Sequence, residues 1–118
     1  MRLLLPTVFL LALGCEGPPA PDGAICRDFI HRVCIQPICA QVQVLIPTGQ
    51  TCEQQLQTKA GCLTDDFEFT EPTRARFLSC RLALLRESPN VEAHPQCDEV
   101  AEVFDRCPDV VRMLQGVK

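Results

Sequence analysis

Residues 25–34 read ICRDFIHRVC, a stretch in which apolar side chains recur at the spacing of one helical face. Charged and polar residues fill the opposite face. Cys26 and Cys34 both belong to the apolar face, yet a continuous helix holds their Cα atoms about 12 Å apart. A disulfide needs Cα atoms roughly 4.4 to 6.8 Å apart, so these two cysteines must each pair with another element. The apolar face consists of Ile25, Cys26, Phe29, Ile30, Val33 and Cys34.

A second stretch, residues 52–62, reads CEQQLQTKAGC and predicts a second helix. Cys52 and Cys62 would lie about 15 Å apart on a continuous helix, so they cannot pair with each other either. The simplest arrangement is an antiparallel helical hairpin with two rungs. We therefore predict the disulfides Cys26–Cys62 and Cys34–Cys52.

Four further cysteines complete the set after residue 34, and they predict two more disulfides. Cys97 and Cys107 have the same ten-residue separation as Cys52 and Cys62, so a helix between them excludes that pair. Cys39 and Cys80 each take one of them, in an order that the spacing leaves open. Eight cysteines allow 105 pairings in all, so the complete pairing remains a hypothesis.

The rest of the chain predicts further short helices. Thr51 and Gln54 fit a capping box for the helix from Cys52, and Cys52, Leu56, Ala60 and Leu63 form its apolar stripe. A third helix is expected from Thr70, with Pro72 in its first turn, and Ser88-Pro89-Asn90 ends it. Its expected apolar side comprises Ala75, Leu78, Leu82 and Leu85, with Phe77, Cys80 and Leu84 beside it.

The last helical stretch is expected near Pro95. Its apolar stripe comprises Cys97, Val100, Ala101 and Phe104. Pro108 either kinks this helix or begins a fresh turn that carries Val110, Val111 and Leu114. Residues 41–44 and 66–69 alternate with period two, which favours a minor two-stranded ribbon. The expected fold is mainly α, a small disulfide-stapled bundle of three to five short helices.

The first residues, MRLLLPTVFLLALGC, have the layout of a secretory signal, with Arg2 before an apolar run. The end of this run resembles the lipobox of bacterial lipoproteins. That resemblance implies a diacylglycerol thioether and palmitate on Cys15, which would then be the first residue of the mature chain. The expected organisation is a signal peptide over 1–14, a lipidated cysteine and Pro/Gly tether over 15–24, and a helical domain over 25–118.

Cysteine parity separates lipidation from its alternative, plain secretion. Ala12 and Gly14 also form an acceptable site for ordinary signal peptidase. The chain has nine cysteines, however, and an odd thiol in an oxidising compartment needs a role. With Cys15 lipidated, the remaining eight can close four disulfides: Cys26, Cys34, Cys39, Cys52, Cys62, Cys80, Cys97 and Cys107.

The chain as a whole resembles small, Arg-rich, cysteine-rich lipoproteins of myxobacterial type, which have no assigned activity. The resemblance implies a location in the cell envelope, with the membrane bound through the N-terminal lipid. Glu16 after the lipidated cysteine implies export to the outer membrane, by analogy with other lipoproteins. The resemblance to these lipoproteins also implies an envelope protein as partner, and a structural or binding module as function.

Composition and charge exclude two classes of function. Eleven basic residues against fifteen acidic ones leave no excess to bind nucleic acid. The apolar run at the N-terminus falls short of the roughly 18 residues that span a bilayer. Without Arg2 the mature chain has a net charge of −5, so we expect the lipid and not a basic patch to hold it on an anionic membrane.

The sequence offers no catalytic set, and we expect neither an enzyme nor a cofactor. Ser79 and Ser88 are the only serines after the signal, and no G-x-S-x-G surrounds them. A small-ligand carrier or an enzyme remains the less favoured alternative, because either would need a cavity with converging polar groups.

Metal binding is not expected. Zinc sites favour close cysteine pairs, and the nearest grouping here is Cys26, His31 and Cys34, with His31 on the polar face. His94 precedes a proline at a helix start and is interpreted as a loop or capping residue. The acids Asp65, Asp66, Glu68 and Glu71 lack the pattern of an EF-hand and are interpreted as a solvated turn.

Overall fold

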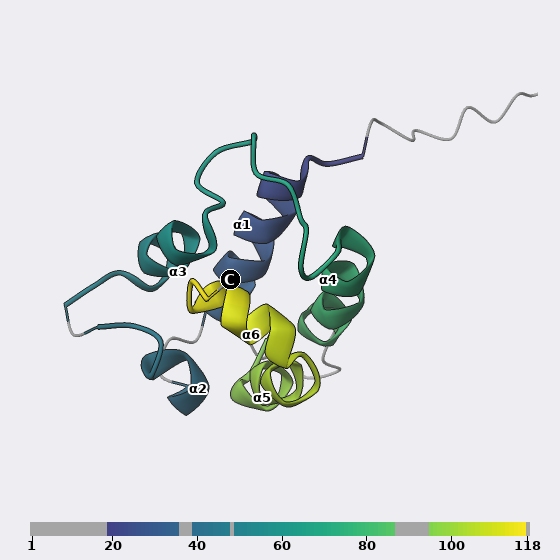
Figure 1. The fold of residues 1–118 in the computed structure, drawn as a ribbon. Helices are drawn as coiled ribbons and strands as arrows, with labels where there is room; N and C mark the ends of the chain where they lie inside the picture. The colour runs from purple at the N-terminus through teal and green to yellow at the C-terminus, as the bar shows by residue number, and fades with distance from the viewer. Residues whose placement is uncertain (1–18, 36–38, 48, 87–94, 118) are drawn as a thin grey trace, which may run out of the picture.

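The computed structural model describes residues 19–35, 39–47, 49–86 and 95–117 of the 118-residue chain. These residues form a small helical bundle held by four disulfides, which confirms the expected fold class (Figure 1). The bundle has six α-helices and one 3₁₀-helix, more than the three to five expected. They are α1 (Asp22–Val33), α2 (Ala40–Gln43), α3 (Cys52–Ala60), α4 (Arg74–Arg81), η1 (Leu82–Leu85), α5 (Cys97–Arg106) and α6 (Pro108–Leu114).

The predicted antiparallel hairpin of α1 and α3 is present with both of its rungs. Cys26–Cys62 joins Cα atoms 6.2 Å apart, and Cys34–Cys52 joins Cα atoms 5.7 Å apart. The first rung connects the first half of α1 to Cys62, two residues after α3, and the second connects the end of α1 to the start of α3. This crossed pairing is what makes the two helices antiparallel.

The other two disulfides resolve the order that the sequence left open. Cys39 pairs with Cys97, which ties the start of α2 to the start of α5. Cys80 pairs with Cys107, which ties α4 to the junction of α5 and α6. Together the four disulfides link α1 to α3, α2 to α5, and α4 to the junction of α5 and α6.

The core lies between α1 and the helices around it. Figure 1 shows α3 and α4 on opposite sides of α1. Phe29 of α1 and Phe77 of α4 are fully buried, with ring centroids 4.7 Å apart. Phe69, from the segment that leads into α4, adds a third ring 4.5 Å from Phe77. Aromatic contacts of this kind add to the stabilisation from burial alone. Among the described residues no polar or charged residue is buried.

Helix α1 begins earlier than the sequence analysis expected, which corrects the boundary of the tether at residues 15–24. The helix starts at Asp22, with Pro21 as its N-cap, so residues 22–24 belong to the domain. Gly23 is buried against the loop after α3, and a Cβ atom there would lie 2.5 Å from the Thr64 carbonyl oxygen. Only a glycine allows so close an approach, because any side chain would displace the loop.

The predicted two-stranded ribbon is wrong. Residues 40–43 form the short helix α2, and residues 66–69 belong to no regular element. The described chain contains no strand. The alternation at Val42 and Val44 instead leaves Val42 buried in the core and Val44 82% exposed on the helical turn. An alternation of only four residues cannot distinguish a strand from one turn of helix.

The expected start of α4 is also wrong. The helix begins at Arg74, not at Thr70, and Pro72 precedes it. Thr73 is the N-cap, and its hydroxyl oxygen accepts a hydrogen bond from the Arg76 backbone N–H at 3.3 Å. A side-chain cap of this kind satisfies an N–H that the first helical turn would leave unpaired.

The buried face of α4 differs from the expected one. Phe77 and Cys80 are buried, whereas Ala75 is exposed and Leu78 lies at the edge of the core. Leu82 is 63% exposed. The reason is that the α-helix ends at Arg81 and continues as the 3₁₀-helix η1, which has three residues per turn. This change of period moves Leu82 outward and turns Ala83 and Leu84 into the core.

The apolar stripes of α3 and α5 are narrower than expected. Leu56 is buried, but α3 ends at Ala60, and Leu63 beyond it is 53% exposed. In α5 the buried residues are Val100 and Val103, while Ala101 and Phe104 lie at the edge.

The helix starts differ in their capping bonds. The Thr51 hydroxyl donates to the Gln54 side chain, so no capping box forms at α3, although the helix starts where expected. A capping box that the sequence analysis missed is present at Gln96 and Glu99 at the start of α5.

Pro108 begins the separate helix α6, one of its two expected roles. The expected stop at residues 88–90 lies outside the described residues.

The different burial of Phe77 and Leu82 gives a direct test of the fold. We expect Phe77→Ala to lower the free energy of unfolding by about 3–5 kcal/mol, because it leaves a cavity beside two other rings. Leu82→Ala is the matched control and should cost no more than about 0.5 kcal/mol. Urea unfolding of both variants measures the difference, and equal losses would contradict the assigned face of α4.

A second test addresses the disulfides. The helices are short, and short helices are marginal without tertiary support. Each disulfide is expected to contribute about 2–4 kcal/mol by restricting the unfolded chain. We therefore expect a strong reductant to abolish the helical circular dichroism signal at room temperature. A reduced protein that keeps its full helical signal would show that the core alone holds the fold.

Candidate ligand-binding groove

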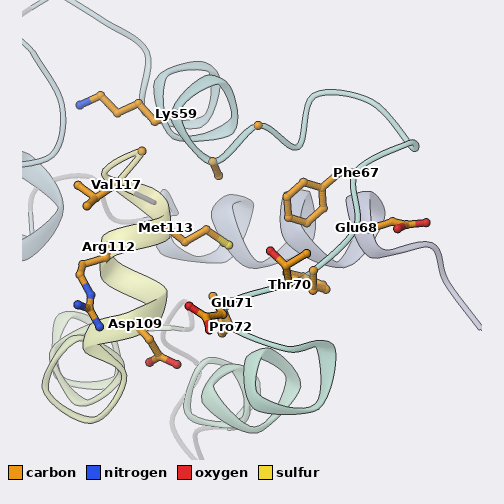
Figure 2. A pocket seen from close by; sticks show the side chains of 14 residues that line it. Lys59, Phe67, Glu68, Thr70, Glu71, Pro72, Asp109, Arg112, Met113 and Val117 are labelled. Carbon is orange, nitrogen blue, oxygen red and sulfur yellow. The ribbon is translucent and has the colours of Figure 1, made fainter.

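A surface groove of about 870 Å³ lies between the segment 67–72 and α6, with the end of α3 at its rim. Its size falls in the range of small-ligand and peptide pockets. Figure 2 shows that Phe67, Thr70 and Met113 extend toward the same space from opposite walls. We call this feature the α6 groove.

The wall formed by residues 67–72 is held in place through its two phenylalanines. The rings of Phe67 and Phe69 meet edge-to-face at 5.1 Å, and Phe69 packs on Phe77 in the core. The Phe69 backbone N–H donates to the Asp22 carboxylate at 2.9 Å. A contact between side chains two positions apart is typical of extended backbone, which fits residues 67–69, before the bend at residues 71–72.

Asp22 connects three parts of the molecule at this wall. Besides accepting from Phe69, its carboxylate accepts a hydrogen bond from the Arg74 guanidinium at 2.6 Å. These bonds, the one from Phe69 first and the one from Arg74 second, hold the pKa of Asp22 below its usual value. The start of α1, the segment 67–72 and the start of α4 therefore share a single ionised group.

The opposite wall is α6. Arg76 of α4 holds its first turn through hydrogen bonds of 3.1 and 3.2 Å to the two carboxylate oxygens of Asp109. The same guanidinium donates to the Arg106 carbonyl oxygen at 3.0 Å. The hydrogen bond from Arg76 lowers the pKa of Asp109. One turn further along α6, the flexible thioether of Met113 projects into the groove (Figure 2).

The rim at α3 depends on a close approach between two helix ends. Gly61 adopts φ = 78° and ends α3, as glycine readily does in the left-handed region. Lys59 reaches away from the groove and donates to the Leu45 carbonyl oxygen at 3.2 Å. Gly116, just after α6, lies where a Cβ atom would be 3.2 Å from the Lys59 carbonyl oxygen. The groove is therefore closed at this end by backbone.

The charge of the α6 groove is uneven. Glu68 and Glu71, on the segment 67–72, are exposed and have no hydrogen bond or ion pair with any described residue. Arg112 on α6 points away from the segment in Figure 2, and Asp109 is already paired with Arg76. The wall of residues 67–72 is therefore acidic, and its charges are available.

The acidic stretch of the sequence divides into two roles. Asp65 forms an ion pair with Arg27 of α1, and the Asp66 carboxylate accepts a hydrogen bond from the Thr64 hydroxyl. Glu68 and Glu71 instead belong to the wall of the α6 groove, and the Glu68 side chain extends away from α6 (Figure 2). The interpretation of the whole stretch as a solvated turn is therefore incomplete, because two of its acids line a groove.

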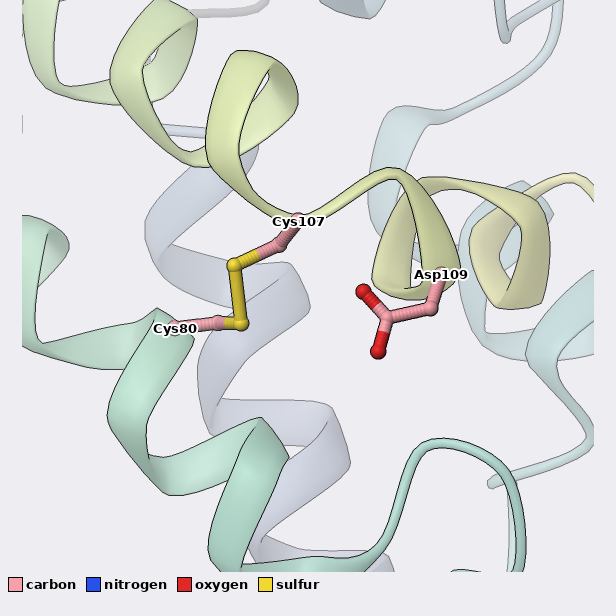
Figure 3. A group of neighbouring side chains, drawn as sticks. All are labelled: Cys80, Cys107 and Asp109. Carbon is pink, nitrogen blue, oxygen red and sulfur yellow. A yellow bond between two sulfur atoms is a disulfide. The ribbon is translucent and has the colours of Figure 1, made fainter.

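One group of three candidate metal ligands lies in the part of the chain that the structure describes. The two sulfur atoms of Cys80 and Cys107 and a carboxylate oxygen of Asp109 lie within 4.8 Å of one another. Figure 3 shows that the two sulfurs are bonded to each other as a disulfide. Disulfide sulfurs are not thiolate ligands, and Asp109 is paired with Arg76, so this group is a structural contact.

The histidine grouping in the sequence does not form a site either. Cys26 and Cys34 belong to separate disulfides. His31 is exposed and lies 2.8 Å from the Glu53 carboxylate on α3. This contact adds a polar link between α1 and α3 on the outside of the hairpin. His94 lies outside the described residues.

A second, smaller pocket of about 360 Å³ lies between α4 and α5 and is lined by arginines. Arg86 and Arg106 both pair with Glu102, whose pKa is lowered chiefly by the hydrogen bond from Arg86. The charges here are satisfied within the protein. Ser79 lines this pocket, whose described lining residues include no histidine, and Ser88 lies outside the described residues.

No family model, no curated protein and no solved structure matches the chain. Among the helices that the structure describes, none is long and apolar enough to cross a membrane. Four disulfides indicate a location outside the cytoplasm, either extracellular or in the envelope. Cys15, the expected lipidation site, lies outside the described residues.

Sequence reasoning missed Phe67, Phe69 and Met113 as groove residues. The alternation of residues 66–69 was the available signal, since it indicates an extended segment with both phenylalanines on one side. It was assigned to a paired strand. The partner that this segment meets is α6, more than forty residues further along the chain, and no local pattern indicates that contact.

The position of Asp22 predicts a pH dependence of stability. Its pKa is lower in the folded protein than in the unfolded chain, so its contribution is present above the unfolded pKa of about 3.9 and is lost as the pH falls through the folded pKa. We expect Asp22→Asn to be less stable than wild type at neutral pH. The difference in the free energy of unfolding between Asp22→Asn and wild type should narrow below about pH 4.

Urea unfolding at neutral and acidic pH measures this effect. Asp105→Asn is the matched control, because Asp105 is exposed and has no ion pair with any described residue. It should have little effect at either pH. A gap for Asp22→Asn that stays constant down to acidic pH would contradict the role of the carboxylate.

Proposed function

We propose that this protein is a bacterial lipoprotein that acts as a binding module of the cell envelope, anchored through a lipid on Cys15. The observation that carries the proposal is the disulfide set. All eight cysteines after Cys15 pair with one another, which leaves none for Cys15. A thiol without a partner in an oxidising compartment fits the lipobox-like end of the signal.

The geometry of the first described residues supports an anchor close to the domain. The Arg74 guanidinium donates to the Ala20 carbonyl oxygen at 2.9 Å as well as to Asp22, which holds the chain where it enters α1. The six residues 16–21 can extend at most about 20 Å. A lipid on Cys15 would therefore keep the start of α1, and the segment 67–72 bonded to it, near the membrane surface.

The charge and the rigidity of the domain fit this role. With a net charge of −5 the mature chain gains no attraction to an anionic surface, so the lipid must supply the membrane affinity. Disulfides between distant helices keep the α6 groove in one conformation. A preformed groove loses less entropy when it binds than a flexible one does. An envelope protein as partner and the outer membrane as location are part of this proposal.

The anchor is tested by mass spectrometry of the protein purified from its native membrane. We expect a mature chain that starts at diacylated Cys15 and carries eight oxidised cysteines. Growth with an alkyne analogue of palmitate should label the protein. Sucrose-gradient separation of the membranes should place it with the outer membrane.

Two variants make this test specific. Cys15→Ala should lose the label and the membrane association, because the lipid has no other attachment site. Glu16→Gln, at the neighbouring position, should keep the label. An unlabelled wild-type chain in the culture fluid would overturn lipidation and support plain secretion.

A further inference from the structure

We propose that the segment 67–70 binds an extended, basic peptide segment of a partner protein, which adds to it as a strand in the α6 groove. This inference rests on the proposed function, because it names the class of partner that the binding module takes. Addition of the peptide as a strand requires three properties of the groove. These are free backbone groups along one wall, apolar surface for alternate side chains and an uncompensated charge that selects the peptide.

Free backbone groups are present on the segment. The Phe69 N–H donates to the Asp22 carboxylate at 2.9 Å, and the Phe67 N–H closes a turn on the Thr64 carbonyl oxygen at 3.4 Å. The N–H and C=O groups of Glu68 and Thr70 form no hydrogen bond with any described residue. Both residues are exposed and line the groove. Successive residues of an extended chain direct these groups to opposite sides, so Glu68 and Thr70 present theirs away from α1.

An unpaired row of this kind is the feature that strand addition uses. Main-chain hydrogen bonds supply the affinity, and pockets for every second side chain supply the specificity. Glu68 and Thr70 are two positions apart, like the alternate residues whose N–H and C=O groups lie along one edge of a strand. The segment is short, so the peptide would form one local pairing and not an extended sheet.

The α6 groove has apolar surface for the alternate side chains of such a peptide. Phe67 and Met113 approach it from the two walls, and Pro72 lies at its base (Figure 2). Met113 is unbranched and can adjust to side chains of different shape. β-branched side chains pack well beside aromatic rings on neighbouring strands, which favours valine or isoleucine in the peptide.

Charge complementarity favours a basic peptide. Glu68 and Glu71 are the acids on the wall to which the strand would add, and neither is paired with a described residue. The arginines that line the second pocket, by contrast, are paired with Glu102 or Asp109. Lysine or arginine side chains on the outward face of the peptide could therefore meet two free carboxylates.

The test is a titration of the full mature protein, in non-ionic detergent micelles, with a labelled peptide of about eight alternating valines and lysines. We expect saturable binding by fluorescence anisotropy. Amide NMR shifts on binding should be largest at Glu68 and Thr70. The same peptide with alternate N-methylated amides should not bind, because it lacks the backbone donors on one edge.

Three variants identify the contacts. Glu68→Gln together with Glu71→Gln should weaken binding about three- to tenfold. Asp105→Asn, which removes an acid outside the groove, should leave the affinity unchanged. Thr70→Pro removes one N–H donor at an exposed position and should also weaken binding. Circular dichroism of each variant checks that the helices are intact.

Several results would overturn the inference. They are equal binding of a peptide of alternating valine and glutamate, undiminished binding of the N-methylated peptide, or shifts confined to residues outside the groove. Absence of saturable binding at millimolar peptide would also overturn it. None of these measurements depends on the lipid, so a failure here is distinct from failure of the Cys15 labelling.

Discussion

The fold depends on a simple constraint, which is that two cysteines far apart on a continuous helix cannot bond to each other. Cys26 and Cys34 lie on α1, so each must reach α3, and this forces the antiparallel pair. The same constraint acts on α5, whose two flanking cysteines bond to Cys39 and Cys80. The disulfides thus do more than restrict the unfolded chain, because they determine which helices lie side by side.

The position of the wall of residues 67–72 in the α6 groove depends on the contacts that hold the start of α1. Asp22 accepts hydrogen bonds from the segment 67–72 and from Arg74, and Gly23 lets the loop after α3 pack directly on the helix. These contacts hold the segment at the surface, with Phe69 packed on Phe77 of the core. The backbone groups of Glu68 and Thr70 then have no partner among the described residues, since α6 offers side chains and not a strand. A constraint on the fold has therefore produced a candidate binding surface.

The proposed anchor and the proposed peptide site lie at the same end of the domain. Arg74 contacts both the residues before α1 and Asp22, which is bonded to the segment 67–72. A lipid on Cys15 would hold this edge of the domain near the membrane surface. The short tether then raises the local concentration of both partners, which favours even a weak interaction.

The sequence by itself determined the class of fold, the oxidising location and the pairing of α1 with α3. These depend on helical periodicity within ICRDFIHRVC and on distances along one helix, which are local properties. The tertiary structure decided the order of the other disulfides, the outward turn of Leu82 and the meeting of Phe67 with Met113. Those features depend on a change from α to 3₁₀ geometry and on contacts between distant segments. Neither leaves a periodic signal in the chain, because packing against the rest of the molecule selects them.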